Sequence, residues 1–367
     1  MRSSSSTQPL GMPLWRAVST RRTRARTSSA PGMPGRKANI GPRVPARGGV
    51  PAGPPYRDGV RFSISIPQFD PDGFDADGVK SYLTRAEELD FEGGWVLEQP
   101  IGPTPLIAPL ELLAYAAACT TRLRLGVGVL VSSLHDPLQL AASVTAVDRL
   151  SHGRLDVGVA PGGGRRKFAA FGVARETFVG YFTEGLELMK AAWSDEPRVT
   201  FHGRFRDVDD LPIQPKPIQR PHPPIWFGAN APAALARAAR HGDGFLGAGS
   251  SSTESFAAAV RVVRRELDEQ GRDATRFRIG KRVYLMVDDD ATRARDRVMT
   301  GLKRIYGNMA GIDAVPVAGT PVEVAQGLRA VIAAGAQMVL CNPVGATVAE
   351  DREQMERLAA EVLPQLA

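Results

Sequence analysis

The sequence contains no long hydrophobic run and only two cysteines. A membrane helix needs roughly 18 or more consecutive apolar residues, and no stretch of this chain approaches that length. No membrane-spanning segment is therefore expected. Cys119 and Cys341 both stand among apolar neighbours, without the ligand spacing of a zinc site. This pattern is more typical of two buried reduced thiols than of a disulfide or a metal site.

Histidine and the common catalytic motifs are also scarce. The chain has five histidines, no two of which share metal-ligand spacing on one helix face, so no metal is expected. The segment GVGVLV lacks the third glycine of a dinucleotide fingerprint, and GGGRRK lacks the Gly-Lys-Ser/Thr of a P-loop. The Gly-x-Ser-x-Gly elbow of an esterase is missing too. Such a chain suits an enzyme whose cofactor supplies the reactive chemistry.

Acidic residues are absent from positions 1–57, which carry eleven Lys or Arg. The remainder has 35 basic residues against 39 acidic ones, so the body of the protein is mildly acidic. Residues 1–57 are rich in Ser, Pro, Gly and Arg, which predicts a disordered basic tail. Three interpretations stay open: an extension from a misplaced start codon, a flexible tail, or a weak nucleic-acid tether. Arg21 and Arg22 are not followed by the apolar segment of an export signal, so a cytoplasmic protein is expected.

Residues 58–367 are expected to form one α/β domain. Eight β-rich runs alternate with helical patterns, which predicts a parallel sheet covered by helices. Eight strand–helix units favour a (β/α)₈ TIM barrel, and a doubly wound open sheet is the alternative. The predicted strands are residues 60–67, 93–98, 123–132, 154–160, 224–229, 243–248, 279–288 and 336–343. The predicted helices are residues 77–90, 109–120, 137–150, 177–193, 231–241, 253–270, 290–306, 321–334 and 348–363.

The interval at about 195–223 breaks this alternation. It is dense in proline and polar residues. A loop of this length inside a compact domain is usually a functional cover or an insertion. We expect an insertion that forms a flap over the barrel mouth.

Polar and small residues follow the predicted strands, at the end where barrel enzymes bind their ligands. The second strand ends in Glu98 and Gln99, and the loop after the third contains His135, a candidate donor or general acid. Three further loops are rich in small residues: 162–164, 228–230 and 247–252. Their backbones can approach a phosphate-bearing or flat ligand closely, and the alternative is that glycine merely closes these turns.

Several segments match a known family in order and spacing. The most specific is TRLRLGVGVL followed by HDPLQLAASVTAVDRLSHGRLDVGVAPGG, and further matches are PIQRPHPPIWFGAN, RAARHGDGF, GKRVYLMVDDD and GTPVEVAQGL. On these residues the chain resembles the bacterial luciferase-like flavin- or deazaflavin-dependent oxidoreductases. The resemblance runs from about Val60 to Leu366, and the tail has no counterpart in it. It implies a barrel that binds a reduced flavin or deazaflavin at the C-terminal ends of its strands.

The resemblance also implies which residues contact the cofactor. The ring lies against a bulge in the third strand, where the family tends to have a non-prolyl cis peptide. The implied ring contacts are that peptide, at Gly128 and Val129, and the backing residues Leu130 and Val131. The implied phosphate and tail contacts are Gly228, Ala229, Asn230, Gly247, Gly249 and Ser250, with Gly162 and Gly163 beside the tail.

Two positions depart from the family pattern. Many relatives end the second strand in Asp-His, where this chain has Glu98 and Gln99. Because glutamine does not titrate near neutral pH, proton transfer there is absent or passes to Glu98, His135 or the substrate. FMN-binding relatives often carry an Arg-Tyr pair where this chain has Phe178 and Val179. The loss of that phosphate partner favours the deazaflavin over FMN without deciding between them.

The resulting hypothesis is an oxidoreductase that acts on a small organic substrate with reduced FMN or deazaflavin coenzyme F420. FMN would make it a monooxygenase, with a flavin reductase as partner, and the deazaflavin would make it a hydride-transfer enzyme. Glu98 is the candidate acid, base or ring-contacting group, and Gln99 is a candidate partner of the ring edge. The alternative for Glu98 is a solvated strand-end carboxylate or a helix cap.

The resemblance further suggests a homodimer, and no specific nucleic-acid partner is expected. The alternative function is that of a non-catalytic flavin-binding or nucleic-acid-associated protein that uses the basic tail as its contact. A third interpretation is a degenerate barrel that binds no cofactor.

Overall fold

The structure, a computed structural model, describes residues 59–69, 73–102, 105–162 and 165–366. The predicted tail, the predicted start of the domain at residue 58, and Gly163 lie outside these residues.

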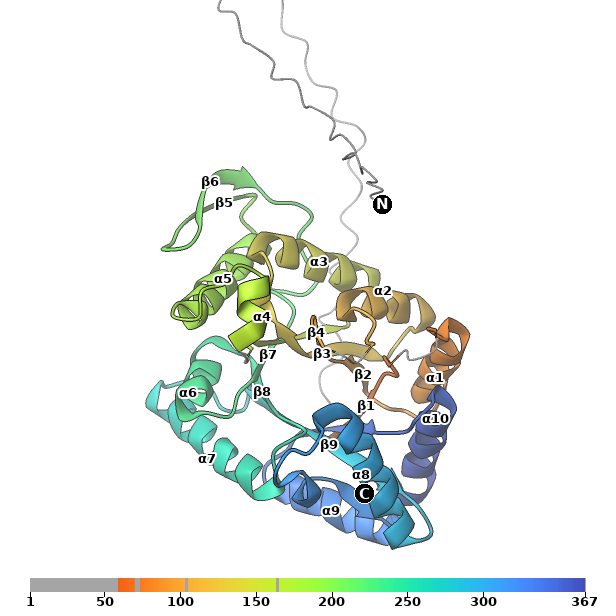
Figure 1. The fold of residues 1–367 in the computed structure, drawn as a ribbon. Helices are drawn as coiled ribbons and strands as arrows, with labels where there is room; N and C mark the ends of the chain where they lie inside the picture. The colour runs from red at the N-terminus through yellow and green to blue at the C-terminus, as the bar shows by residue number, and fades with distance from the viewer. Residues whose placement is uncertain (1–58, 70–72, 103–104, 163–164, 367) are drawn as a thin grey trace, which may run out of the picture. The chain divides into compact units, whose positions relative to one another are not determined.

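Eight parallel strands close into a barrel (Figure 1). They pair in the order β11-β1-β2-β3-β4-β7-β8-β9, and β9 pairs with β11 to complete the ring. A closed ring rules out the doubly wound open sheet, so the predicted (β/α)₈ barrel is confirmed. The strands are β1 Arg61–Ser65, β2 Gly93–Val96, β3 Arg124–Val131, β4 Leu155–Ala160, β7 Ile225–Gly228, β8 Gly244–Gly247, β9 Arg278–Val287 and β11 Met338–Pro343.

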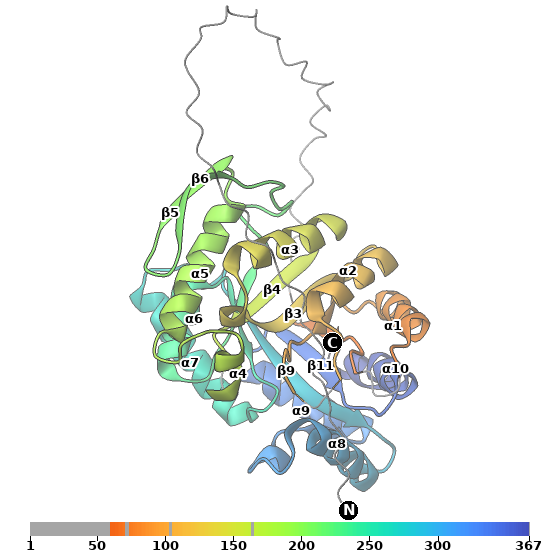
Figure 2. The same cartoon turned by 45° about the horizontal axis from the view of Figure 1, so that its top comes forward.

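Helices surround this ring on its outside (Figure 2). Their apolar faces pack on the strands in one large buried cluster. All nine predicted helices are found, with bounds that differ by a few residues. They are α1 Ala76–Glu88, α2 Pro109–Cys119, α3 Pro137–Leu150, α5 Phe178–Trp193, α6 Pro232–His241, α7 Thr253–Glu269, α8 Ala291–Tyr306, α9 Pro321–Ala333 and α10 Val348–Arg357.

Several elements were not predicted, including a hairpin in the insertion and the following features. A short helix, α4 Arg165–Ala170, precedes α5, and a short strand, β10 Val317–Gly319, pairs with β9 beside the ring. After α10 the chain continues as a π-helical turn over Leu358–Val362 and a 3₁₀ turn over Leu363–Leu366.

Short polar residues set where several helices begin. Asp136 accepts hydrogen bonds from two backbone N–H groups in the first turn of α3, and Pro137 occupies the first helical position. Thr320 and Glu323 form a reciprocal capping box at the start of α9. These local signals explain why the predicted starts agree with the structure.

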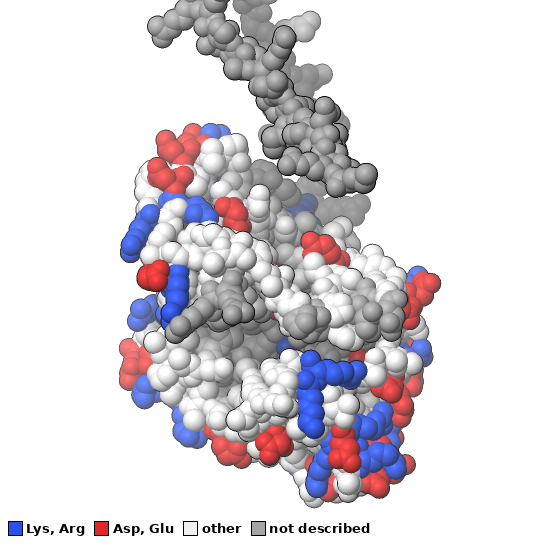
Figure 3. Space-filling model, viewed as in Figure 1, with Lys and Arg blue, Asp and Glu red and all other residues white. Residues whose placement is uncertain are grey.

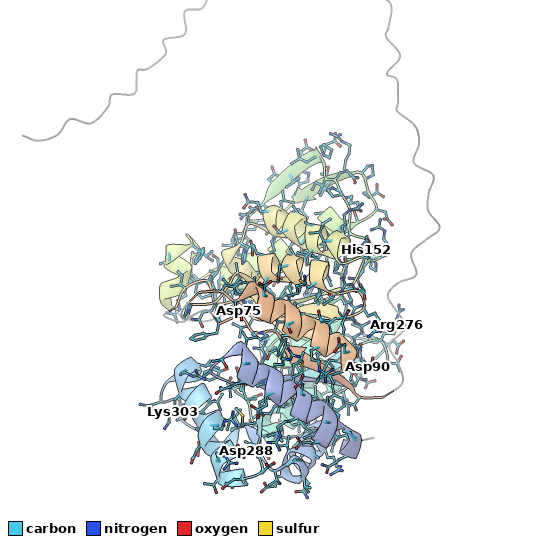
Figure 4. The ribbon with its side chains drawn as sticks, turned by 90° about the vertical axis from the view of Figure 1, so that its right-hand side faces the viewer. Asp75, Asp90, His152, Arg276, Asp288 and Lys303 are labelled. Carbon is cyan, nitrogen blue, oxygen red and sulfur yellow. The ribbon has the colours of Figure 1, made fainter. Side chains whose placement is uncertain are left out.

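The loops at the two ends of the barrel are distinct. Asp75 caps α1 after β1, at the end where the strands finish. Asp90, His152 and Arg276 each precede a strand, and Figure 4 shows them toward the opposite side of the view from Asp75. Ligand groups at the ends of the strands therefore belong to the Asp75 side.

Two tryptophans fill the inside of the barrel. The rings of Trp95 from β2 and Trp226 from β7 meet edge to face, with centroids 5.6 Å apart. Trp95 lies over Gly126 of β3, where a Cβ would come within 2.2 Å of its ring. Trp226 donates from Nε1 to Asp156 at 3.1 Å, and Asp156 also accepts from Arg124 Nε at 2.7 Å. The barrel interior is therefore a packed core whose charged group is paired and hydrogen-bonded.

The insertion between α5 and β7 contains an antiparallel hairpin. β5 Arg198–His202 pairs with β6 Asp207–Pro212. Val199 and Val208 of this hairpin pack with Leu188 of α5 in a separate buried cluster. The hairpin is thus held on the outer side of α5 by its own apolar face.

The predicted flap over the barrel mouth is wrong. After the hairpin, the backbone N–H groups of Ile218 and Gln219 donate to Asp148 of α3, at 2.5 and 3.1 Å. The chain then enters β7 at its N-terminal end, with Pro224 accepting from the N–H of Val157. Polar groups of the insertion thus attach it to the buried Asp148 near the C-terminal end of α3 and to the start of β4.

The described residues bear on the expected absence of a membrane-spanning segment and on the state of the two cysteines. None of the helices described is long and apolar enough to cross a membrane. Cys119 and Cys341 are both free thiols, and Cys341 is fully buried while Cys119 is half-buried.

Replacing Gly126 with Ala tests the close contact beneath Trp95. The new methyl group would lie 2.2 Å from a ring carbon, so the ring or β3 has to move. Overpacking of this kind costs about 1–3 kcal/mol, and we expect Gly126→Ala to lower the free energy of unfolding in urea by that amount. Gly185→Ala on α5 is the control, because its Cβ would meet only Pro137, at 3.6 Å. Since Ala favours a helix over Gly, equal destabilisation in both variants would contradict the packing argument.

Candidate active site

Two cavities lie at the C-terminal ends of the strands. The first, the apolar cavity, has a volume of about 150 Å³ and is walled by the ends of β1, β2 and β11 and by α8. The second, the glycine cavity, has a volume of about 360 Å³ and lies among the ends of β3, β4, β7 and β8. Barrel enzymes place their active sites at this end of the fold.

The glycine cavity gathers predicted cofactor residues from β3 and from three separate loops. Gly162 has a φ of +78°, a conformation that favours glycine, and a Cβ there would collide with Val131. The structure therefore places around one cavity residues that the family resemblance had implied as cofactor contacts. The predicted residues that line this cavity are Gly128, Val129, Gly162, Gly228, Ala229, Asn230, Gly247 and Gly249.

Ser250 lines an adjoining cavity of about 570 Å³, the serine cavity, which shares Asn230 and Gly247 with the glycine cavity. Four serine side chains at the start of α7 contribute to its wall: Ser250, Ser251, Ser252 and Ser255. Within the described part of the chain, no Lys or Arg lines this cavity. The polar side chains of its lining are therefore neutral, and the ammonium group of Lys281 lies behind them, 3.1 Å from the hydroxyl of Ser251.

β3 changes register where the resemblance implied a bulge. Its pairing with β4 is regular up to Val127 and resumes at Leu130 with one extra residue on β3. The peptide between Gly128 and Val129 is cis, as the resemblance implied. Leu130 is fully buried in the barrel core, and Val131 is half-buried. Neither residue is among the described residues that line the two cavities.

Glu98 joins the end of β2 to the end of β3. Its Oε2 accepts from the backbone N–H of Val131 at 2.5 Å, and its Oε1 lies 2.7 Å from Nε2 of His135. The Glu98 side chain is 5% exposed and the His135 side chain 33% exposed. The hydrogen bond from Glu98 raises the pKa of His135 above its ordinary value, and burial opposes this rise. Two predicted catalytic residues are thus in direct contact, with both carboxylate oxygens of Glu98 engaged.

Gln99, the third predicted catalytic residue, lines the apolar cavity. A second amide at this rim, Gln68, received no role from the sequence. Its Oε1 accepts from the N–H of Leu97 at 3.0 Å, and its Nε2 donates to the carbonyls of Leu97 and Ile107 at 2.8 and 2.6 Å. Gln68 therefore fixes the end of β2 and the following loop.

Arg282 lines both cavities and was missed by the sequence reasoning. It lies in β9, is 8% exposed, and donates from Nη2 to the carbonyl of Gly128 at 2.7 Å. Tyr306 lines the glycine cavity, and its hydroxyl lies 2.8 Å from that of Tyr284. Burial raises the pKa of Tyr306. The only sequence signal for Arg282 was the adjacent pair of Lys281 and Arg282 inside a largely apolar strand.

Few charged side chains border the hollow on this face of the molecule. Figure 3 shows a hollow in this face bordered mostly by uncharged residues, with Lys and Arg gathered over the region of α8. Arg304 of α8 donates to the carbonyls of Val344 and Gly345 at 3.2 and 3.1 Å. This exposed arginine thus attaches α8 to the loop after β11.

Comparison with known proteins assigns the chain to a family. A family model described as luciferase-like monooxygenase matches residues 60–362. The chain belongs to this family. The FMNH₂-dependent dimethylsulfone monooxygenase of Pseudomonas putida is 27% identical over 181 residues, which are 48% of each chain. The luciferase-like chain spans about half the length of the curated relatives it matches.

Solved structures show the same barrel. Monooxygenase RslO1 from Streptomyces bottropensis has a TM-score of 0.72 at 26% identity, covering 84% of this chain and 100% of that one. The coenzyme F420-dependent tetrahydromethanopterin reductase from Methanopyrus kandleri has a TM-score of 0.69 at 20% identity, covering 84% and 100%. The second likeness is one of fold. The luciferase-like family comprises flavin- or F420-dependent oxidoreductases.

Replacing Glu98 with Gln removes the charge beside His135 in this luciferase-like chain. The pKa of His135 should fall, because the carboxylate raises it, and NMR titration of the ring protons measures the change. A raised histidine pKa stabilises the fold below the unfolded pKa of about 6.5, and this contribution is lost as pH rises through the folded pKa. The free energy of unfolding of Glu98→Gln should therefore lie further below that of wild type at about pH 5.5 than at about pH 9.

Asp207→Asn is the matched control for this variant. Asp207 pairs with His202 at 2.6 Å, but their side chains are 80% and 67% exposed. Solvent screens such a pair, so the control should change stability little at either pH. An unchanged pKa of His135 in Glu98→Gln would refute the assigned interaction.

Proposed function

We propose that the chain is an oxidoreductase that binds a reduced flavin-type cofactor in the glycine cavity and a small organic substrate in the apolar cavity. The observation that carries this proposal is the meeting of three glycine-containing loops and the end of β3 around one cavity. The apolar cavity adjoins it, since Arg282 lines both. A concave, largely apolar site with a few placed polar groups is typical of a cofactor enzyme.

The glycine cavity suits a flat ring. A Cβ at Gly128 would lie 2.7 Å from a methyl group of Leu246, and a Cβ at Gly228 would lie 3.2 Å from Val129. A larger residue at either position would therefore displace Leu246 or Val129, which both line the cavity, and would change the shape of its wall. Bare backbone at the glycine loops also leaves N–H groups free to approach that ligand.

Coenzyme F420 is our preferred cofactor. The terminal phosphate of FMN carries nearly two negative charges at neutral pH, whereas the tail of F420 contains a phosphodiester with a single charge. The serine cavity offers hydroxyl groups, and no Lys or Arg is among the described residues that line it. Neutral donors suit a singly charged group, while a dianion is better matched by arginine or lysine. The apolar Phe178 and Val179 at the start of α5 agree with this preference.

In its reduced form F420 supplies a hydride, and the residues of the chain bind, orient and shield the reactants. The apolar walls of the first cavity exclude water from the reacting groups. Gln99 lines this cavity and can hydrogen-bond a substrate, but its amide does not titrate. Glu98 holds Val131 in place and orients His135, which keeps a proton to higher pH than an ordinary histidine.

FMN is the alternative cofactor, and it would make the chain a monooxygenase that receives reduced flavin from a separate reductase. The names of two relatives, monooxygenase RslO1 and the FMNH₂-dependent enzyme of Pseudomonas putida, favour this alternative.

Separate titrations with F420 and FMN test the cofactor. We expect F420 to bind at micromolar concentration or tighter, and FMN at least about tenfold more weakly, because the serine cavity lacks a described cation. Cofactor fluorescence measures both affinities. Binding of FMN without binding of F420 would overturn the preference. If neither cofactor binds or raises the melting temperature by mass action, the oxidoreductase proposal itself fails.

Filling the glycine cavity tests where the cofactor binds. Ala234 on α6 lines this cavity, so Ala234→Phe should weaken cofactor binding by at least about tenfold. Ala233→Phe is the matched control, because Ala233 is the preceding residue of the same helix and is exposed. Melting temperatures of both variants show that they are folded. Equal affinities in the two variants would place the cofactor elsewhere.

A further inference from the structure

Arg282 is a buried cation between the two cavities. It is 8% exposed, and its described hydrogen bond runs from Nη2 to the carbonyl of Gly128 at 2.7 Å. Its Nε is buried without a hydrogen-bond partner among the described residues. A buried donor without a partner costs about 1–3 kcal/mol, so such a group is usually satisfied by something that binds.

No described carboxylate compensates this charge. None of the Asp or Glu residues that the structure describes forms an ion pair with Arg282, whereas Arg124, another buried arginine, pairs with Asp156 at 2.7 Å. The neighbouring Lys281 adds positive charge, and burial together with Arg282 lowers the pKa of Lys281 to about 7. The ammonium group of Lys281 is engaged with the carbonyls of Ala248 and Ser251. The uncompensated positive charge therefore remains with Arg282.

The apolar cavity has room for a compact apolar body beside this charge. Its volume of about 150 Å³ equals that of an engineered cavity that accepts benzene. Asp351 also lines this cavity, and burial raises its pKa to about 7. Asp351 is therefore mostly neutral in mildly acidic solution and then opposes an incoming anion little.

We propose that the apolar cavity binds an organic acid, a compact apolar molecule whose carboxylate pairs with the guanidinium of Arg282. Arginine matches a planar carboxylate in shape and charge, and burial strengthens the pairing. A phosphate dianion fits less well, because one buried cation leaves most of its charge uncompensated. This inference rests on the proposed function, which makes the cavity the substrate site, and it names the substrate class.

Benzoate and benzamide form a matched pair of probes, since they share shape and differ in charge. Their binding is measured by calorimetry at about pH 6, where benzoate is ionised, with the protein alone and with the protein loaded with whichever of F420 or FMN binds. Wild type should bind benzoate at least about tenfold more tightly than benzamide. Arg282→Met should abolish this preference, and Arg282→Lys should keep part of it because the charge remains. Arg304→Met, on the wall of the same cavity, should keep it in full.

The outcomes separate this inference from the proposed function. A benzoate preference in the protein alone supports the inference even if neither cofactor binds. A preference that survives Arg282→Met, or is lost in Arg304→Met alone, overturns it. Absence of any preference in wild type, loaded and unloaded, overturns it as well. A preference lost on cofactor loading overturns it too, because the cofactor then takes the charge of Arg282.

Discussion

The rim of the barrel depends on the hydrogen bonds of the Glu98 carboxylate. β3 gains one residue between Val127 and Leu130, so its last segment leaves the regular ladder with β4. Glu98 satisfies the N–H of Val131 just after that change, from the end of β2. On the other side, Arg282 binds the carbonyl of Gly128 from β9. The displaced strand end is thus held by charged side chains from the adjacent β2 and from β9 across the barrel. Hydrogen bonds of charged groups are stronger than neutral ones.

The same glycines serve the core and the cavity. Gly126 leaves space for the ring of Trp95, and two residues later Gly128 leaves space for Leu246 and Arg282. Successive inward positions on a strand are two residues apart, so β3 presents bare backbone first to the packed interior and then to the ligand cavity. Core packing by Trp95 and the shape of the glycine cavity are therefore consequences of one sequence feature, the Gly-Val-Gly of β3.

Most of the fold followed from the sequence, and the site followed in part. Strands buried on both faces give apolar runs, and helices give clear caps, so both kinds of element were predicted close to their bounds. Eight of the predicted cofactor residues line one cavity, because loops after parallel strands share one end of a barrel. Arg282 was missed because its inward direction depends on the closure of the ring through β9. The insertion was misplaced because its apolar residues Val199 and Val208 pack on α5, a contact that no local pattern specifies.

The pairing of Glu98 with His135 changes the meaning of the amide at position 99. Many relatives have an acid and an imidazole in succession at the end of the second strand, and this chain has a glutamine in the second place. The structure nevertheless contains an acid–imidazole pair at this rim, built from β2 and from the loop after β3. His135 has a raised pKa there, and its side chain is one-third exposed, so it can exchange a proton with solvent. A proton-carrying group is thus present at this rim, and Gln99 lines the apolar cavity as an uncharged amide.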